Sequence, residues 1–282
     1  MTIAISGASG QLGRIAVQAL KSHVDAGSII ALARDTAKVA DLGVETRAFD
    51  YTKPETLQVA LLGVDVLALV SSSDFADRVG QHENVITAAQ AAGVGRIIYT
   101  SILKADQSPL LIARDHRKTE EILTNSGITY TILRNPWYFE NWTASLPIAV
   151  EQGAMIGATG DGKTTPATRQ DLGEALAAVA AGNGHDNMIY ELGADTAITL
   201  NDMAAALSRH VGRAIPYNDL PKDSYAGILA SVGLPEGFAA VIADAEAGIP
   251  EGWLSTDSGD LSRLIGRPTT TLDAAVAEAL QN

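Results

Sequence analysis

Three glycines, Gly7, Gly10 and Gly13, stand at three-residue intervals near the start of the chain. Glycine permits a tight turn that a Cβ atom would obstruct, and it lets the backbone approach a phosphate closely. A helix that begins at such a turn directs its free N–H groups and the positive end of its dipole at the same point. The spacing therefore predicts a site for the pyrophosphate of a dinucleotide. The alternative is a turn that is glycine-rich for packing alone.

The segments on either side of the glycines have the composition that such a site needs. Ile3–Ile5 is a short apolar run of the kind that forms a buried strand, and apolar residues recur at helical spacing over 15–20. The order of strand, glycine turn and helix makes the dinucleotide prediction much stronger than the glycines alone. The pattern G-x-x-G-x-x-G resembles that of the extended and atypical short-chain dehydrogenase/reductase superfamily.

The residue at the end of the second predicted strand, 28–34, indicates which dinucleotide is bound. Arg34 stands about twenty residues after the last glycine, where an acidic residue would select the ribose hydroxyls of NAD. A guanidinium suits the 2′-phosphate of NADPH, because its fork of donors matches phosphate oxygens. Lys38 adds a second cation nearby. The sequence thus favours NADPH over NADH, and the alternative is a solvated Arg34 paired with Asp35.

Strands and helices alternate over the first half of the chain. Further strands are predicted at 44–49, 65–70, 96–101 and 128–133, with helices at 54–62, 82–92 and 111–123. Such alternation is typical of an α/β fold with a Rossmann-type, doubly wound parallel sheet, whose ligands lie at the carboxyl ends of the strands. Two strand ends carry polar groups. Ser71, Ser72 and Ser73 either line the nicotinamide ribose or make a tight turn, and Asp50 either lies by the adenine or caps the next helix.

The alternation weakens after the sixth strand. We expect residues 1–135 to form the NAD(P)-binding Rossmann domain, to which later segments return. Residues 136–282 are expected to form a smaller, helix-rich domain on the substrate side. The elements predicted there include a helix over 171–181, a strand over 188–192 and a helix over 199–211 that Thr199 and Asp202 cap.

The composition excludes several classes of function. The net charge is −13 and no cluster of Lys and Arg appears, so duplex DNA is not an expected partner. No apolar run approaches the ~18 residues of a membrane span, so no membrane insertion is expected. The chain has no cysteine, which excludes disulfides, thiolate catalysis and cysteine-ligated metal and is compatible with the cytoplasm. No metal site is predicted.

The usual acid of short-chain dehydrogenases is missing. These enzymes carry a Tyr-x-x-x-Lys pair on the helix after the fifth strand, where tyrosine donates a proton to the reduced carbonyl. In this chain Ile112 takes the tyrosine position and His116 the lysine position. Either the protein binds a dinucleotide without turnover, or its substrate needs no such acid, as a quinone does not. His116 could then act as an acid, hold the nicotinamide ribose, or have no role.

Segments along nearly the whole chain resemble the NmrA-like branch of atypical short-chain dehydrogenases, and most of all its bacterial NADPH:quinone oxidoreductases. They include Gly7–Gly13, Tyr99–Ser101, Leu133–Tyr138, Gly160–Lys163 and Leu264–Leu272. The resemblance implies NADPH as cofactor, with Arg34 at its 2′-phosphate and a glycine loop of Gly7, Ala8, Ser9, Gly10, Gln11 and Leu12. It also implies that the Ser71–Ser73 turn and the loop of Asn135, Pro136, Trp137, Tyr138 and Asn141 flank the nicotinamide. The candidate catalytic residues are His116 and Tyr138, and the candidate substrate-binding residues are Trp137, Phe139 and Arg169.

The leading hypothesis is NADPH-dependent reduction of small quinones. The clustered aromatic residues 137–139 favour an enzyme, because flat acceptors stack on rings. The missing acid favours an NADP(H)-sensing regulator that acts on a protein partner. A third hypothesis is reduction of another flat conjugated electrophile in the same site. The sequence leaves the oligomeric state open, with a homodimer among the alternatives.

Overall fold

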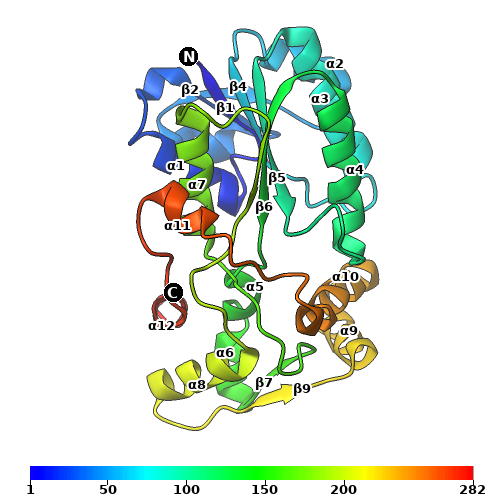
Figure 1. The fold of residues 1–282 in the computed structure, drawn as a ribbon, viewed down its shortest axis with the longest axis vertical. Coiled ribbons are helices and arrows are strands. Elements are labelled where there is room, and N and C mark those ends of the chain that lie inside the picture. The colour runs from blue at the N-terminus through cyan, green and yellow to red at the C-terminus, as the bar shows by residue number, and fades with distance from the viewer. Residues whose placement is uncertain (282) are drawn as a thin grey trace.

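The structure, a computed structural model, describes residues 1–281 and contains a seven-stranded parallel sheet (Figure 1). In spatial order its strands are β3 (Glu45–Ala48), β2 (Ile29–Ala33), β1 (Ile3–Ile5), β4 (Val66–Leu69), β5 (Arg96–Ile102), β6 (Thr129–Asn135) and β8 (Met188–Glu191). The strand order reverses between β1 and β4, which is the point where doubly wound sheets bind ligands. The predicted fold class is confirmed.

Helices cover both faces of this sheet, so its central strands are buried on both sides, while the edge strands β3 and β8 are partly exposed (Figure 1). Ile3 and Ile5 pack on one face and Ala4 on the other, which explains why the strands are apolar without alternation. One face is covered by α1 (Gln11–Leu20), α7 (Arg169–Ala181) and α11 (Asp260–Ile265). The other is covered by α2 (Pro54–Ala60), α3 (Arg78–Ala92) and α4 (Leu111–Asn125).

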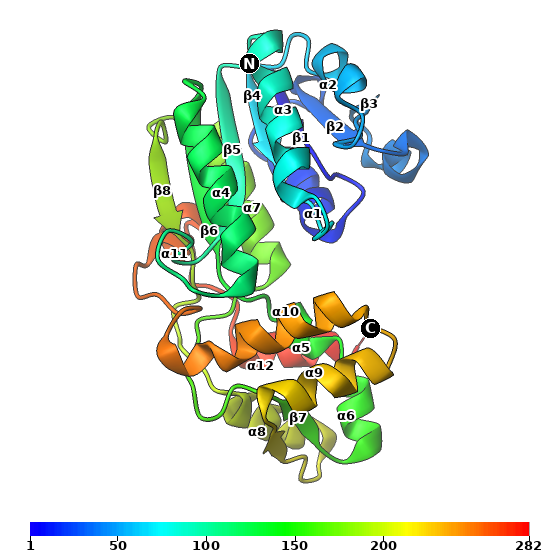
Figure 2. The same cartoon turned by 90° about the vertical axis from the view of Figure 1, so that its right-hand side faces the viewer.

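The second half of the molecule lies beyond the carboxyl ends of the sheet (Figure 2). It consists of α5 (Glu140–Thr143), α6 (Leu146–Gln152), β7 (Met155–Gly157), α8 (Leu200–Val211), β9 (Tyr217–Asp219), α9 (Lys222–Ser231), α10 (Glu236–Ala247) and α12 (Leu272–Ala279). Short 3₁₀ helices occur at Ala26–Ser28, Thr36–Leu42 and Ile249–Glu251. The chain enters this half after β6, returns to the sheet for α7 and β8, and leaves it again. Strands β7 and β9 form a separate parallel pair.

Local signals in the sequence set several element boundaries. Gly93 ends α3 with a φ of +77°, a left-handed conformation that suits glycine. The predicted capping box is confirmed, because the Thr199 hydroxyl accepts from the Asp202 N–H and the Asp202 carboxylate accepts from the Thr199 N–H. Asp50 is not a helix cap. Its carboxylate accepts from the N–H and the hydroxyl of Thr52, and no side chain caps α2.

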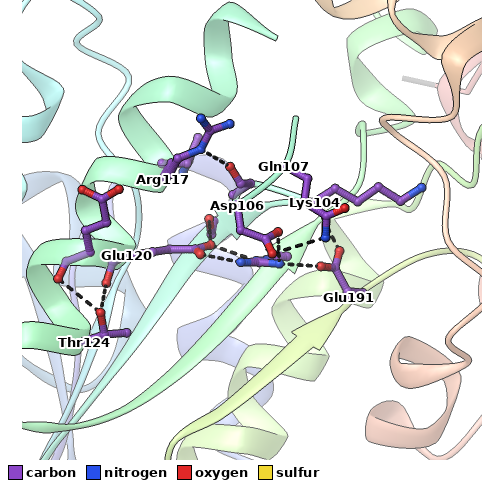
Figure 3. A network of polar contacts seen from close by, with 12 residues as sticks. Lys104, Asp106, Gln107, Arg117, Glu120, Thr124 and Glu191 are labelled. Carbon is purple, nitrogen blue, oxygen red and sulfur yellow. Dashed lines mark hydrogen bonds and ion pairs between the residues drawn. The ribbon is translucent and has the colours of Figure 1, made fainter. Parts of the chain in front are cut away.

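A partly buried charge network fixes the loop after β5 against the sheet (Figure 3). The guanidinium of Arg134, on β6, donates to both carboxylate oxygens of Glu120 on α4, at 3.0 and 2.6 Å. It also donates to Asp106 at 2.7 Å and to Glu191 on β8 at 2.8 Å. Glu120 in turn accepts from the Ser101 hydroxyl at 2.6 Å. The network therefore ties the ends of β5, β6 and β8 to α4, directly behind the carboxyl edge of the sheet.

Glu246, on α10, is a buried carboxylate in the second half. It is 1% exposed and accepts from the indole N–H of Trp142 at 2.8 Å, from the Ala158 N–H at 2.9 Å and from the Tyr225 hydroxyl at 3.2 Å. Burial raises its pKa to about 7 in spite of these donors. These contacts connect α5, α9 and α10 with the residue that follows β7, so the ionisation of this one group acts on the packing of these elements against one another.

We expect this carboxylate to make stability fall as pH rises. The folded pKa of about 7 lies above the ordinary value of 4.5, so the unfolded chain releases this proton at lower pH than the folded protein does. The loss of folding free energy caused by this group is absent below pH ~4.5 and grows between the two pKa values. It reaches about 3 kcal/mol above pH ~7. Urea unfolding of the native protein and of Glu246→Gln at about pH 5 and about pH 8 tests this. The variant should lose less stability between the two pH values, and an equal loss in both proteins would contradict the assignment.

No helix within residues 1–281 has both the length and the hydrophobicity needed to cross a bilayer.

Candidate functional site

One cavity of about 780 Å³ extends along the carboxyl ends of the strands. It begins at the glycine turn between β1 and α1, passes the ends of β2, β4, β5 and β6, and finishes against α10. Phe238, Val241 and Ile242 of α10 line that far end. The ring of Phe238 lies 5.2 Å from the ring of Phe75, which belongs to the sheet half. Both halves therefore build the cavity, and its size is in the range of cofactor and ligand sites.

The glycine turn forms one end of the cavity. Gly7 has a φ of +62°, which favours glycine. A Cβ atom at Gly13 would lie 2.3 Å from the carbonyl oxygen of Gly7, so Gly13 is required for close packing of helix on turn. Gly10 is the N-cap of α1 and leaves the first N–H groups of the helix without a side-chain partner. These free donors at a helix N-terminus fit the pyrophosphate of a dinucleotide.

Most of the predicted glycine loop faces the cavity. The residues of the loop that line it are Gly7, Ser9, Gly10, Gln11 and Leu12. Ala8 does not, because it is fully buried in the core on the α1 side of the sheet.

Arg34 follows β2 and lines the cavity beside Asp50 and Tyr51. The proposed surface partner of Arg34 is engaged elsewhere, since the carboxylate of Asp35 accepts from the Ala37 N–H and caps the following 3₁₀ helix. Within residues 1–281 the guanidinium of Arg34 has neither a hydrogen bond nor an ion pair, and the residue is exposed. Its donors are therefore free for an anion that enters this end of the cavity.

The serine turn after β4 also lines the cavity, with all of Ser71, Ser72 and Ser73. The hydroxyl of Ser72 donates to Gln81 at 2.7 Å and accepts from the Asp74 N–H at 3.1 Å. Its own N–H donates to the ring nitrogen Nε2 of His82 at 2.9 Å. The middle serine therefore stabilises a tight turn, which was one of the two expected roles.

The loop after β6 contributes a second polar wall. Its residues Asn135, Pro136, Trp137, Tyr138 and Asn141 line the cavity. Asn135 donates to the hydroxyl of Tyr138 at 3.0 Å, and the guanidinium carbon of Arg169 lies 4.7 Å from the centre of the Tyr138 ring. Arg169 also pairs with Glu140 at 3.4 Å and donates to Asn141 at 3.2 Å. Arg169 and Tyr138 are thus held in place at the cavity wall.

Phe139 does not line the cavity, although it was expected to bind substrate. It is 2% exposed and packs in the core of the second half with Trp142 and Leu146. Its N–H donates to Ala167, which joins the loop to the segment before α7. The backbone at this point directs Tyr138 toward the cavity and Phe139 away from it.

Both positions of the missing Tyr-x-x-x-Lys pair are in the cavity wall. Ile112 and His116, one turn apart on α4, line the cavity where tyrosine and lysine would stand. His116 is 6% exposed, and its ring nitrogen Nδ1 lies 2.8 Å from the hydroxyl of Tyr99. Burial, together with the charge of Arg78, holds the pKa of this imidazole well below its usual value, so it is neutral at physiological pH.

Other hydroxyl groups near His116 offer little acid chemistry. Ser101 lines the cavity, but its hydroxyl donates to Glu120 at 2.6 Å. Tyr99 is fully buried, and burial raises its pKa. Tyr138 remains: its hydroxyl accepts from Asn135 and keeps its own proton available, although burial raises its pKa as well. A strong proton donor is absent from the cavity wall within the described part of the chain.

Sequence reasoning missed several residues of the wall. They are Phe49, Tyr51, Asp74, Phe75, Arg78, Gln81, Glu140, Ala144 and the α10 residues Phe238, Val241 and Ile242. No signal in the sequence pointed to Arg78. In the structure it occupies the first turn of α3, where the helix dipole disfavours a cation, so its placement there needs another reason. The predicted helix began at His82, which left Arg78 in a loop. No group of side chains suited to a metal ion occurs among residues 1–281.

Comparison with known proteins agrees with this geometry. Residues 7–183 match the sequence pattern of a family described as NAD(P)H-binding. Quinone oxidoreductase 2 of Escherichia coli is 48% identical over 278 residues, which cover 98% of this chain and 97% of that protein. The crystal structure of an NADPH-dependent quinone oxidoreductase from E. coli in complex with NADPH superposes with a TM-score of 0.96, at 48% identity and with 100% of both chains covered. The triphenylmethane reductase of Citrobacter sp., solved with NADP(H), has a TM-score of 0.94 and 35% identity, covering 99% of this chain and 100% of that one. The chain therefore belongs to the NAD(P)H-binding family, as its glycine turn predicted.

Proposed function

We propose that this protein catalyses NADPH-dependent reduction of small quinones by direct hydride transfer. The observation that carries the proposal is a single cavity with free helix N–H groups and an unpaired arginine at one end and an acid-poor, partly aromatic pocket at the other. The full-length similarity to quinone oxidoreductases supports it. The cytoplasm, which a chain without cysteine suits, is the proposed location.

Bound NADPH would supply a hydride, so that NADPH, a proton and a quinone give NADP⁺ and a hydroquinone. The residues of the chain bind and orient the two molecules. The first N–H groups of α1 would hold the pyrophosphate, and Arg34 the 2′-phosphate. The serine turn and the Asn135–Asn141 loop would flank the nicotinamide, and α10 would cover the acceptor and exclude water.

The pocket also suits other flat conjugated electrophiles. The Citrobacter relative is a triphenylmethane reductase, and its fold agrees with this chain over nearly its whole length. Such acceptors share with quinones a product that needs no proton at the moment of hydride transfer. We propose them as alternative substrates of the same site, and a cationic dye is the appropriate probe.

Oxidation of NADPH, followed by the absorbance of the reduced nicotinamide with and without 1,4-benzoquinone, tests the proposed function. We expect oxidation that depends on both the quinone and the protein. Tight binding of NADPH with no oxidation by any quinone or dye would favour the sensing protein instead.

The preference for NADPH is expected to depend on Arg34. Arg34→Ala should weaken the binding of NADPH by about 1.5–3 kcal/mol, because it removes a charge-assisted contact to the 2′-phosphate. The binding of NADH should be nearly unaffected. Lys38→Ala is the matched control, since Lys38 lies outside the cavity wall. Fluorescence titration of both cofactors measures the effect. Equal losses of affinity for NADPH and NADH would show that Arg34 does not contact the 2′-phosphate.

A further inference from the structure

Arg78 is a buried cation in the cavity wall whose donors are largely unused. Its side chain is 4% exposed, and its Nε donates to the carbonyl oxygen of Ser72 at 2.8 Å. The terminal nitrogen Nη1 is buried without a hydrogen-bond partner and makes only a long ion pair with Asp115, at 3.9 Å. A guanidinium carries five N–H donors, so a buried one that uses so few is unusual.

The position of this guanidinium is on the acceptor side of the cavity. Its central carbon lies 4.1 Å from the centre of the Phe75 ring, and Phe75 in turn packs on Phe238 of α10. Its charge also acts on His116 and Tyr138, the two candidate catalytic residues. The glycine turn and Arg34 follow β1 and β2, whereas Arg78 follows β4 and lies against Phe75, which contacts the cover of α10. Arg78 is therefore placed to act on the second molecule rather than on the phosphates of the cofactor.

Reduction of a quinone creates a charge that this position can stabilise. Hydride transfer to one quinone oxygen forms an O–H bond, and the electrons shift through the ring so that both carbon–oxygen π bonds are lost. The product is the aromatic hydroquinone monoanion, with the negative charge on the other oxygen. Water then supplies the proton that completes the hydroquinone. Preorganised donors aimed at the oxygen where charge develops lower the barrier, and they are most effective in a water-poor site. Because the cavity lacks a strong acid, a fixed cation is the available means of stabilising that oxygen.

We propose that Arg78 is a catalytic residue that donates its terminal N–H groups to the quinone oxygen that becomes anionic. This proposal rests on the proposed quinone reduction and names the group that replaces the missing acid. The contact of Nε with Ser72 holds the guanidinium at the wall, next to the ring of Phe75. The neutral imidazole of His116 adds no charge at this point.

A phenolate probe tests the proposal without turnover. 4-Nitrophenol resembles the hydroquinone monoanion when ionised, and its absorbance distinguishes phenolate from phenol. In protein saturated with NADP⁺, which donates no hydride, the native site should bind phenolate more tightly than phenol and so lower the apparent pKa of the bound probe. Arg78→Gln keeps a donor for Ser72 but removes the charge. It should weaken the binding of phenolate about tenfold to a hundredfold and leave the binding of phenol unchanged.

Two further variants separate charge from folding. Arg78→Lys keeps the charge and should retain most of the phenolate preference. Arg209→Met removes an equal charge from an exposed pair with Asp273, far from the cavity wall, and should change nothing. The dissociation constant of NADPH is measured for each protein and should stay constant, while kcat with benzoquinone should fall in Arg78→Gln.

An unchanged pKa of the bound probe in Arg78→Gln would overturn the proposal. If Arg78→Gln bound NADPH more weakly but kept the preference for phenolate, the proposal would also be overturned, and Arg78 would be assigned to cofactor binding. If the native protein reduces no quinone yet shows an Arg78-dependent phenolate preference, the proposed function fails while the anion site stands. The two proposals can thus fail separately.

Discussion

Replacing Gly10 with valine is expected to abolish binding of the dinucleotide and to leave the protein folded. Gly10 is the N-cap of α1, with an extended backbone (φ −84°, ψ 169°) that valine adopts without strain. A Cβ atom there would lie 3.3 Å from the carbonyl oxygen of Gly7, which requires only a small adjustment. The branched side chain would then occupy the space in front of the free N–H groups of the helix, where the pyrophosphate is expected.

Substitutions at two other glycines serve as controls for this experiment. At Gly13 even one added carbon would lie 2.3 Å from backbone, so Gly13→Ala should unfold the protein instead of merely blocking a ligand. At Gly227, on α9, nothing lies within 4 Å of an added Cβ atom, so Gly227→Val is a folded control with normal binding. Circular dichroism and NADPH titration of the three variants separate the effects. Normal titration of NADPH into Gly10→Val would refute the assignment of the glycine turn.

The second large effect is a discrimination between acceptors. The enzyme should reduce benzoquinones and be nearly inert toward simple aliphatic ketones, with a difference in kcat/KM of at least about 10²–10⁴. A reduced ketone is an unstabilised alkoxide that needs a proton during the reaction. Ile112 offers none, and the hydroxyl of Ser101 donates to Glu120 instead. The anion of a hydroquinone is stabilised over its ring and can wait for a proton from water.

Steady-state kinetics with a benzoquinone and an aliphatic ketone, at equal NADPH, measure this discrimination. Tyr138→Phe serves as the matched variant, because Tyr138 carries the one tyrosine hydroxyl of the wall whose proton is not engaged in the structure described. It should leave the discrimination unchanged. Efficient reduction of ketones by the native protein, lost in Tyr138→Phe, would instead identify Tyr138 as the missing acid. His116→Ala should slow quinone reduction only modestly, since a neutral imidazole transfers no charge to the substrate.

The sheet was predictable because its central strands are apolar on both faces and the helices between them are bounded by strong signals. Strands 96–101 and 188–192 differ from β5 and β8 by one residue at one end. The phosphate end of the cavity was predictable for a similar reason. Glycine spacing and the position of Arg34 depend on local backbone geometry, which the sequence expresses directly.

The acceptor end of the cavity depends on contacts between distant segments, so fewer of its residues could be predicted from the sequence. The cover that α10 provides, with Phe238 against Phe75, joins residues far apart in the chain. Phe139 looked like a pocket residue because neighbouring aromatics share a loop, and only the backbone direction separates it from Tyr138. The protonation of His116 follows from burial, which composition does not reveal. Arg78 was missed because α3 begins four residues earlier than its apolar pattern does.

The return of the chain to the sheet has a consequence for synthesis on the ribosome. Helix α7 packs on α1 so closely that a Cβ atom at Gly173 would lie 2.5 Å from the side chain of Ile15, and β8 pairs with β6. Both partners emerge long after the segments they cover. Helix α7 is complete 161 residues after α1 (181 − 20), and β8 is complete 56 residues after β6 (191 − 135). At ~5–20 residues per second, these delays are roughly 8–32 s and roughly 3–11 s. During these intervals the apolar face of α1 and the edge of β6 have no native cover, so both are exposed to contacts with other chains.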